Sequence, residues 1–468
     1  MKNNLKLLFQ AHWLFLIIAL IFGGAFIKVT PPLWGADEGQ HFFRAYQISQ
    51  DQISQRQVKV NGVLFSGGVI PSTFLRLDHL REHDIADAIP GETHQVDNRN
   101  IYDRVASVPT NKDKTTANPY SKNIYSPFVY TAPALGIYLG KLFSHEPLTL
   151  LLWARAMTLL FYVGLTVVAI YMLRKTFIKW LVLVVALLPM SIYQASVVSP
   201  DSLLLGISFI FFAVMYRLYF LKQIPTRKNI SVLAVSASLL AFIKAPYVIL
   251  VFLLTLLPLH QNTSSRQRRI IRIGIPILVL LVAIASIASV RGVIVTSLPN
   301  TNPTEQLHWI MSHPLGYAYT LVNSILVLDW VPQVVGLFGS SFVFIPGIII
   351  QSLIVGVTLL SFMETRPKEN APEVVNRKVG GLIIAVAVVA SLAIISSLYL
   401  TWTPVGHNLV AGIQGRYFVP IVLFILVGAR SLTDKRLIFS EKSIRIGATC
   451  LTTTSLLVSV LWYYRILY

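Results

Sequence analysis

Long apolar runs recur along the chain, separated by shorter polar connections. A helix that crosses a bilayer needs about 20 mainly apolar residues, because the hydrocarbon layer is about 30 Å thick. The runs therefore predict an all-α polytopic membrane protein with about eleven transmembrane helices in a single domain, residues 1–468. The predicted spans are 11–29, 150–172, 180–198, 202–220, 229–243, 246–260, 271–290, 337–361, 379–400, 417–430 and 446–464.

Basic residues gather in every second connection between these spans. With the N-terminus in the cytoplasm, all of the basic connections fall on the cytoplasmic side, as the distribution of positive charge in membrane proteins requires. The connections concerned are 2–6, 174–179, 217–228, 266–272, 366–378 and 430–445. The pattern predicts a multipass plasma-membrane protein with a cytoplasmic N-terminus. It also accounts for most of the net charge of +19 without a nucleic-acid partner.

Two larger polar segments then lie outside the cytoplasm. The first, 30–149, is expected to carry juxtamembrane helices, and its Gly67-Gly68 and Pro71 turn signals favour a small ordered cap. The second is 291–336. Within the first segment, 125–143 is apolar but short and rich in proline, so we expect it to lie at the membrane interface. Counting it as a span would reverse the sidedness of every later basic connection.

Composition excludes several classes of function. Hydrophobic residues make up 54% of the chain and charged residues 13%, which is too apolar for a soluble domain. The single cysteine, Cys450, excludes an intramolecular disulfide and argues against a metal–thiolate site. The sequence has no Walker loop, no dinucleotide-binding glycine pattern and no Gly-x-Ser-x-Gly elbow, so nucleotide hydrolysis is not expected.

The strongest cluster of reactive side chains directly follows the first span, in PPLWGADEGQHFFRAYQIS (31–49). Asp37 and Glu38 are adjacent acids, and His41 follows at helical spacing. A carboxylate at an apolar interface holds protons more tightly than in water and can act as a general base. Asp37, Glu38 and His41 are therefore candidate catalytic residues. The same spacing also fits an ordinary helix start, with Asp37 as the cap and Glu38 as a solvated first-turn acid.

Asp201 lies in a tight outside turn, Ser-Pro-Asp, on the same side of the membrane as Asp37. It is the only acidic residue between Glu146 and Glu305. Asp201 is a candidate for orienting an acceptor or a metal ion, and the alternative is a simple helix cap.

Three cations near the outer ends of spans are candidates for binding the phosphate of a substrate. They are Lys244, Arg416 and Arg155. Arginine is suited to bidentate phosphate contacts, and an arginine inside a span needs an anionic partner. Alternatively, Lys244 extends to the interface as an ordinary lysine.

Several short motifs occur in a fixed order. They are Asp-Glu-x-x-His after the first span, Gly-Gly-x-Ile-Pro (67–71), Tyr-Ser-Pro-Phe-Val-Tyr (125–130), Ser-Pro-Asp (199–201) and Gln-Gly-Arg-Tyr-Phe-Val-Pro (414–420). Together they resemble an uncharacterised family of bacterial multipass membrane proteins that is grouped with the GT-C superfamily of glycosyltransferases. That superfamily includes the protein mannosyltransferases, the aminoarabinose transferases and the oligosaccharyltransferases. The resemblance runs over nearly the whole chain.

The resemblance implies a GT-C-like bundle in the bacterial cell membrane. It further implies transfer of a sugar from a polyprenyl-phosphate carrier to an acceptor outside the cytoplasm, such as a cell-envelope glycan or a lipid. Asp37 matches the family's catalytic acid of the first external loop, and Asp201 matches the acid of the second. No cofactor is required by this chemistry, although two external acids leave a divalent cation open as an alternative.

Two other functions compete with glycosyl transfer. A flippase or transporter would place ionisable pairs in the middle of the membrane, often in repeated halves. A glycan polymerase or ligase would rely on Arg and His in a late external loop, and His407 with Arg416 keeps that alternative open.

Overall fold

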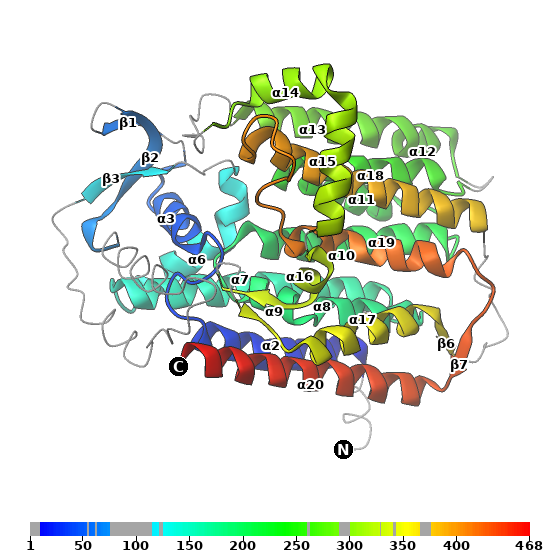
Figure 1. The fold of residues 1–468 in the computed structure, drawn as a ribbon. Coiled ribbons are helices and arrows are strands. Elements are labelled where there is room, and N and C mark those ends of the chain that lie inside the picture. Colours follow the sequence, from blue (N-terminus) through cyan, green and yellow to red (C-terminus); the bar gives the residue numbers. More distant parts are fainter. Residues whose placement is uncertain are drawn as a thin grey trace.

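The computed structural model describes residues 10–53, 56–60, 63–74, 115–120, 125–259, 263–289, 300–327, 329–339, 343–365 and 376–468. In these ranges the protein is predominantly helical (Figure 1). Six helices are long and apolar enough to cross a membrane, or up to eight if two bent helix pairs each count as one span. The prediction of a polytopic helical membrane protein is confirmed at this level, whereas the number eleven is not.

The six long spans lie roughly alongside one another in Figure 1. They are α2 (Ala11–Val29), α7 (Pro147–Met172), α10 (Pro200–Tyr219), α18 (Arg377–Trp402), α20 (Glu441–Leu467) and the continuous segment made of α12 (Ser265–Arg269), the π-helix η3 (Ile270–Gly274) and α13 (Ile275–Ser289). The apolar run 11–29 therefore matches its helix residue for residue.

Other predicted spans are broken or shorter than expected. The run 180–198 forms α8 (Ile178–Ala186) and α9 (Pro189–Ala195), which meet at 61° because Pro189 begins a new helix. The run 337–361 begins as a hairpin of β4 (Leu337–Phe338) and β5 (Val343–Phe344) before α17 (Gly347–Phe362). The remaining short elements are α11 (Arg227–Ile243), the 3₁₀ helix η2 (Ala245–Leu256) and α19 (Val419–Arg430).

One end of the bundle carries the elements of the first polar segment (Figure 1). The amphipathic helix α3 (Glu38–Ile48) is followed by an antiparallel sheet of β1 (Arg56–Val60), β2 (Val63–Pro71) and β3 (Thr115–Tyr120). Gln52 joins the sheet to α3, because its side-chain amide pairs with the backbone of Val69 at 2.8 and 3.1 Å. This sheet departs from an all-α fold and was not predicted.

The apolar stretch 125–143 forms the 3₁₀ turn η1 (Pro127–Tyr130) and the ten-residue helix α6 (Thr131–Gly140). Ten helical residues extend about 15 Å, which is half the thickness of the hydrocarbon layer. The stretch is thus a short helix packed on α7, too short to span the hydrocarbon layer, and its place at the interface stays a prediction.

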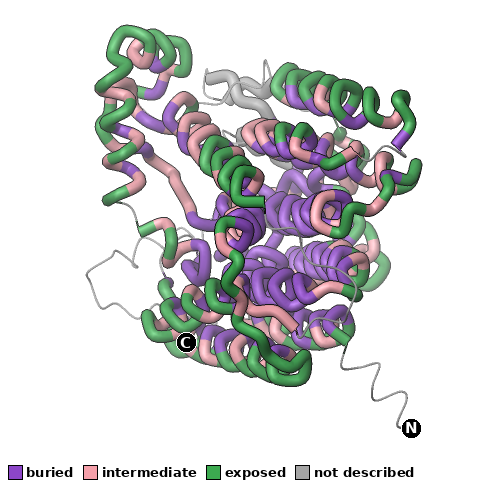
Figure 2. Tube along the Cα trace, turned by 90° about the vertical axis from the view of Figure 1, so that its right-hand side faces the viewer, coloured by how far each residue is buried: buried purple, intermediate pink, exposed green. Residues whose placement is uncertain are grey.

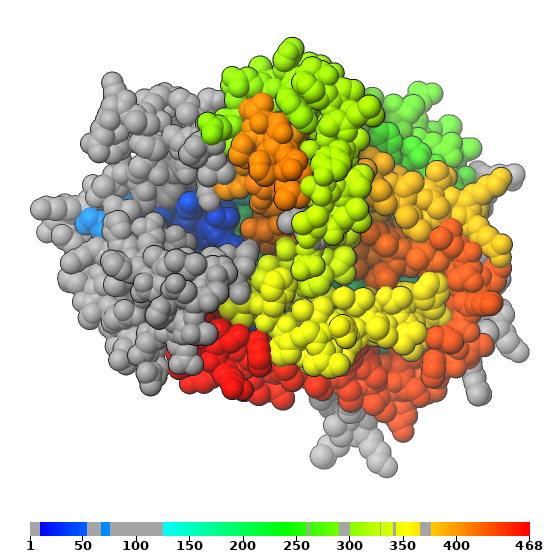
Figure 3. All heavy atoms as spheres, viewed as in Figure 1, coloured from blue at the N-terminus to red at the C-terminus, as the bar shows by residue number. Residues whose placement is uncertain are grey.

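The second polar segment forms three helices, of which α15 runs across the long spans in Figure 1. They are α14 (Pro303–Ser312), α15 (Pro314–Val327) and α16 (Trp330–Gly336), and α15 and α16 meet at 51°. Figure 3 shows α14 and α15 in lime against the orange connection that follows α18. Hydrogen bonds fix this contact, including Gly406 N to Gln306 Oε1 at 3.0 Å and Asn323 Nδ2 to the carbonyl of Asn408 at 3.0 Å.

The core lies where α8, α9 and α10 pass through the middle of the bundle, and the outer helices turn exposed faces away from it (Figure 2). In α10, 78% of the most apolar window is buried, against 22% in the segment Ser265–Ser289. A helix that is apolar all round but half exposed needs lipid beside it.

The short elements gather at the two ends of the bundle. One end carries α3 and the sheet, and the opposite end carries α12 and the strands β6 (Met363–Thr365) and β7 (Leu437–Phe439).

Candidate functional site

Asp37 lies at the start of α3 in an unusual backbone conformation. Its φ is 56° and its ψ 17°, the left-handed region that non-glycine residues rarely occupy. Its carboxylate makes no capping hydrogen bond to the helix, so the capping alternative does not describe it. Instead, Asp37 Oδ2 lies 3.8 Å from Arg416 Nη2, across the bundle end.

Glu38, the next residue, points in a different direction and pairs with Arg155 of α7. Arg155 Nε and Nη2 donate to the two carboxylate oxygens, each at 2.7 Å, and both side chains are completely buried. The carboxylate also accepts from the backbone N–H groups of Gly35 at 2.9 Å and Val198 at 3.0 Å. Arg155 further donates to the carbonyls of Thr30 at 2.7 Å and Pro31 at 2.8 Å.

This pair ties four segments together: the end of α2, the start of α3, α7 and the connection between α9 and α10. The structure thereby supplies the anionic partner that an arginine inside a span requires. The proposed catalytic role of Glu38 and the phosphate-binding role of Arg155 would both need an accessible side chain. Because neither has exposed surface, the mechanism considered below does not use them.

Four other predicted residues meet in one place, which we call the ionic cluster: Asp37, Asp201, Lys244 and Arg416. Lys244 Nζ lies 2.6 Å from Asp201 Oδ1, and Arg416 Nε lies 3.0 Å from Asp201 Oδ2. Arg416 also faces Asp37, so negative and positive side chains alternate through the cluster. With two carboxylates and two cations, the cluster has no net charge.

Helix ends position these charges. Asp201 is the second residue of α10, where Ser199 accepts from its backbone N–H at 3.1 Å and Pro200 fixes the first turn. Lys244 ends α11, and Arg416 lies in the 3₁₀ turn η4 (Gly415–Phe418) before α19. Acids are favoured at helix N-termini and cations at C-termini, so the local backbone stabilises both Asp201 and Lys244.

Aromatic side chains surround the cluster. The ring of Tyr417 lies 4.0 Å from Lys244 Nζ and 5.3 Å from the guanidinium carbon of Arg416. Tyr247 donates its hydroxyl to the carbonyl of Tyr417 at 2.6 Å and so holds that segment in place. Cation–π contacts of this kind stabilise both cations while leaving their outer N–H groups available.

His41 is buried one turn after Asp37. Its Nδ1 is 2.9 Å from the hydroxyl of Tyr130, and its ring packs at 5.7 Å on Tyr125. Burial lowers the pKa of His41 to about 4, with Arg416 and Lys244 adding to the shift and Asp37 and Asp201 opposing it. His41 is therefore neutral at physiological pH, which suits a hydrogen-bonding role beside the cluster better than that of a charged group.

A small polar cavity opens beside Arg416, with room for about one water molecule. Its lining residues are Met190, Gln194, Gln333, Leu337, Gly339, Gln414, Gly415 and Arg416. Gln333 accepts from the backbone N–H of Gly415 at 3.1 Å. Within the described ranges, the side-chain oxygens of Gln194 and Gln414 have no hydrogen-bond partner. Buried polar atoms rarely lack a partner, and these two oxygens can each accept a hydrogen bond from a substrate hydroxyl or from water.

Exposure separates the three acids. The Asp37 side chain keeps 37% of its surface, whereas Asp201 keeps 6% and Glu38 none. Asp37 is thus the acid that a substrate can reach. Among the residues that the structure describes, no group of three His, Cys, Asp or Glu side chains gathers as metal ligands. The two acids of the cluster instead share the guanidinium of Arg416.

The histidines of the later polar segments lie apart from these contacts. His308 and His313 are on exposed parts of α14 and its end, and His407 Nδ1 bonds the backbone of Leu409 at 2.9 Å. The pairing of His407 with Arg416 that would suit a ligase is not among the contacts that either residue makes with the described chain.

Sequence reasoning missed the residues that surround the charges. Tyr125 and Tyr130 lie in the motif 125–130, which signalled a resemblance but no role. Tyr417 lies beside Arg416 in the motif 414–420. Gln194 carried no signal, because a lone amide in an apolar run has no diagnostic spacing.

Comparison with known proteins gives one result. A family model described as "Predicted membrane protein (DUF2142)" matches residues 20–425, which include every residue of the ionic cluster. No curated protein and no solved structure matches the chain. The matched region covers most of the chain, and the protein belongs to the DUF2142 family of predicted membrane proteins.

Proposed function

We propose that this protein is a membrane glycosyltransferase that moves a sugar from a polyprenyl-phosphate carrier to an acceptor on the outer side of the bacterial cell membrane. The observation that supports this proposal is the ionic cluster: an accessible acid beside two cations, at one end of a membrane-embedded bundle. Such a site can hold a lipid phosphate while a hydroxyl is deprotonated next to it. The order of motifs, which resembles an uncharacterised family grouped with the GT-C superfamily, is a second reason for the proposal.

Asp37 is the proposed general base. In the reaction, the acceptor hydroxyl attacks the anomeric carbon as its proton passes to the Asp37 carboxylate. The bond between that carbon and the phosphate oxygen breaks, and its electron pair stays on the departing polyprenyl phosphate. One new carbon–oxygen bond replaces another, with inversion at the carbon, so no cofactor or external energy source is needed.

Lys244 and Arg416 are the proposed phosphate-binding groups. Arg416 uses Nε and Nη2 in its contacts with the acids, but a guanidinium has five N–H donors, and an ammonium has three. Charge that builds up on the leaving phosphate is best stabilised by donors already held in position. Asp201 supplies that positioning, because one carboxylate holds both cations.

The proposed sidedness places the ionic cluster on the extracytoplasmic face. The described basic connections, 174–179, 217–228 and 430–445, lie at the opposite end of the bundle, which suits the cytoplasm. A lipid-linked donor reaches the site from within the bilayer, which explains why a nucleotide-binding fold is unnecessary.

The test is a reconstituted assay with purified protein in liposomes, a panel of radiolabelled polyprenyl-phosphate sugars and an envelope glycan extract as acceptor. Wild type is compared with Asp37→Asn, and Glu305→Gln is the matched control, since Glu305 is an exposed acid outside the cluster. We expect transfer by wild type and the control, and a loss of about 10²-fold or more in Asp37→Asn. Thermal unfolding of all three proteins checks that the fold is retained.

Transfer that survives Asp37→Asn unchanged would remove Asp37 as the base. If no donor supports transfer but the labelled lipid moves across the bilayer, the protein is a flippase and not a transferase. A polymerase or ligase would instead join preformed glycan chains, which the same assay detects as a change in product length.

A further inference from the structure

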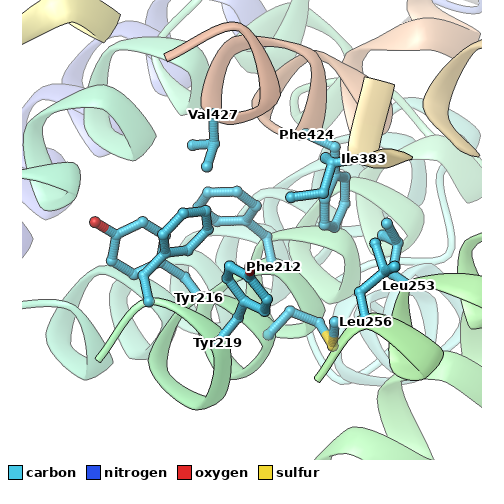
Figure 4. A pocket seen from close by; sticks show the side chains of 10 residues that line it. Phe212, Tyr216, Tyr219, Leu253, Leu256, Ile383, Phe424 and Val427 are labelled. Atoms are coloured by element: carbon cyan, nitrogen blue, oxygen red, sulfur yellow. The ribbon is translucent and has the colours of Figure 1, made fainter. Parts of the chain in front are cut away.

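A second site lies far from the ionic cluster, in an apolar groove between α10, η2, α18 and α19 (Figure 4). The groove is shallow and partly open to the surface, with a cavity volume of about 30 Å³. Its walls are almost entirely apolar and include Phe212, Tyr216, Tyr219, Phe220, Leu253 and Phe424. Aromatic contacts hold the walls together: the rings of Tyr216 and Phe220 stack at 4.8 Å, and Phe212 meets Phe424 at 5.3 Å.

The groove lies toward the end of the bundle opposite the ionic cluster. Along α10, Phe212 is about 16 Å beyond Asp201 at the helical rise per residue. Along the 3₁₀ helix η2, Leu253 is about 18 Å beyond Lys244. The intervening residues Leu204 and Leu250 are each 1% exposed, so the helices are packed between the two sites.

The segment that follows α10 is strongly basic, and so is α12. Lys222 follows Phe220 by two residues and is exposed, and Arg266 and Arg269 are exposed on α12. Gln267 donates from Nε2 to the carbonyl of Pro225 at 3.1 Å, which ties α12 to the segment that carries Lys222. The sequence from 202 to 304 contains no acidic residue, so nothing in that stretch neutralises these cations.

We propose that the groove binds one acyl chain of an anionic phospholipid and that Lys222, Arg266 and Arg269 hold its phosphate headgroup. The apolar walls suit an acyl chain. The cations just beyond the end of α10 and on α12 favour a lipid with net negative charge over a zwitterionic one. Its position, with packed helices between it and the ionic cluster, favours a lipid that enters from the leaflet opposite the catalytic end over the tail of the sugar donor. This inference does not depend on the proposed glycosyl transfer.

The experiment is native mass spectrometry of the full-length protein, exchanged into detergent with phosphatidylglycerol or phosphatidylcholine of identical acyl chains. We expect phosphatidylglycerol to be retained at least fivefold more than phosphatidylcholine. The double variant Lys222→Gln/Arg266→Gln should lose about fivefold in phosphatidylglycerol binding for each cation removed, at the usual strength of a lipid–cation contact. The groove-filling variant Leu253→Trp should lose both lipids.

The matched control is Lys175→Gln/Lys442→Gln. It removes two exposed cations, one just after α7 and one in the first turn of α20, and neither helix lines the groove. It should bind as wild type does. Equal retention of the two lipids by wild type, or equal loss in the control and the groove variants, would overturn the proposal. So would a Leu253→Trp protein that keeps phosphatidylglycerol but loses undecaprenyl phosphate, because the groove would then hold the donor's tail. Thermal unfolding of each variant separates these outcomes from loss of fold.

Discussion

Glu38 and Arg155 are 117 positions apart in the chain, and their side chains meet in a doubly hydrogen-bonded ion pair with no exposed surface. The neighbouring Asp37 lies in the accessible ionic cluster instead. The two adjacent acids thus have different roles. Glu38 fixes the start of α3 against α7, whereas the left-handed backbone at residue 37 turns the Asp37 carboxylate toward Arg416. The fixed pair therefore determines where the accessible acid lies.

Replacing Glu38 with Gln should lower the stability of the folded protein strongly. The substitution leaves Arg155 charged, buried and without its counter-ion, and losing one partner of a buried pair costs about 3–5 kcal/mol. Thermal unfolding of the purified protein in detergent measures this loss. The control is Asp434→Asn, which breaks the ion pair of Asp434 with Arg377, in which both side chains are more than two-thirds exposed. That change should leave stability nearly unaltered, and equal effects in the two variants would contradict the role given to Glu38.

Stability should fall as the pH drops from about 6.5 to about 4, and His41 should account for part of the fall. Burial lowers the pKa of His41 to about 4, whereas an unfolded histidine titrates near 6.5. Between these values the unfolded state binds the extra proton, so the contribution is complete above pH 6.5 and is lost toward pH 4. The difference amounts to about 3 kcal/mol.

Unfolding temperatures between pH 4 and pH 8 provide the measurement. The His41→Gln protein should show a shallower dependence on pH in that window than wild type. His308→Gln, which alters an exposed histidine, should follow the wild-type curve. A His41→Gln curve parallel to that of wild type would show that His41 does not titrate in the window.

Gly136 should be intolerant of even one added carbon. A Cβ at this position would overlap the carbonyl oxygen of Trp153, where α6 lies directly on α7. We expect Gly136→Ala to lower the unfolding temperature and to reduce the proposed transfer, because α6 directly follows Tyr130, which bonds His41. Gly164→Ala in α7 is the control, since nothing lies within 4 Å of a Cβ there. Its stability should be unchanged or slightly higher, and equal destabilisation of both proteins would rule out the close contact as the cause.

Hydrophobic pattern predicted the long helices well and the broken ones poorly. The runs at 11–29 and 379–400 became α2 and α18, because length and apolarity suffice to define an uninterrupted span. The run 180–198 was read as one helix although Pro189 splits it, and 337–361 hid a hairpin at its start. Apolar character alone does not determine whether a run forms one straight helix, a bent helix pair or a β-hairpin. Strand β1 pairs with β2 as a local hairpin, but the pairing of β2 with β3 joins residues some 50 positions apart, which no local pattern records.

For the site, the sequence placed five charged residues on one face of the membrane: Asp37, Glu38, Asp201, Lys244 and Arg416. The structure brings four of them together, whereas Glu38 pairs with Arg155 instead. Topology alone made that inference available, because Asp37, Asp201, Lys244 and Arg416 all lie at the same ends of their spans. Local reasoning could not divide the roles of Asp37 and Glu38, since adjacent residues differ only through long-range partners such as Arg155. Residues of 1–9 and 291–299, on which part of the charge and loop predictions fell, lie outside the described ranges.

Chemical labelling should place the two ends of the bundle on opposite sides of the membrane. In a Cys450→Ala background, Gln50→Cys near the sheet end should react with a membrane-impermeant maleimide in intact cells. Lys222→Cys should react only after permeabilisation, because it belongs to the basic end. Both positions are exposed, so access to the side chain is not limiting. Labelling of residue 222 from outside, with residue 50 protected, would invert the proposed orientation.

Gln194 should affect substrate binding without supporting the fold. Gln194 is 2% exposed and lines the polar cavity beside Arg416. Its side-chain nitrogen lies 3.6 Å from the sulfur of Met190, and its oxygen has no hydrogen-bond partner among the residues that the structure describes. A leucine there removes a buried polar atom that lacks a partner, so stability should be equal or higher. If a substrate hydroxyl occupies the cavity, KM for the donor or the acceptor should rise about tenfold or more in Gln194→Leu, the cost of one unmade hydrogen bond. Gln351→Leu, on an exposed face of α17, is the control and should leave both KM values unchanged. A Gln194→Leu protein with wild-type KM but a lower unfolding temperature would assign Gln194 to packing instead.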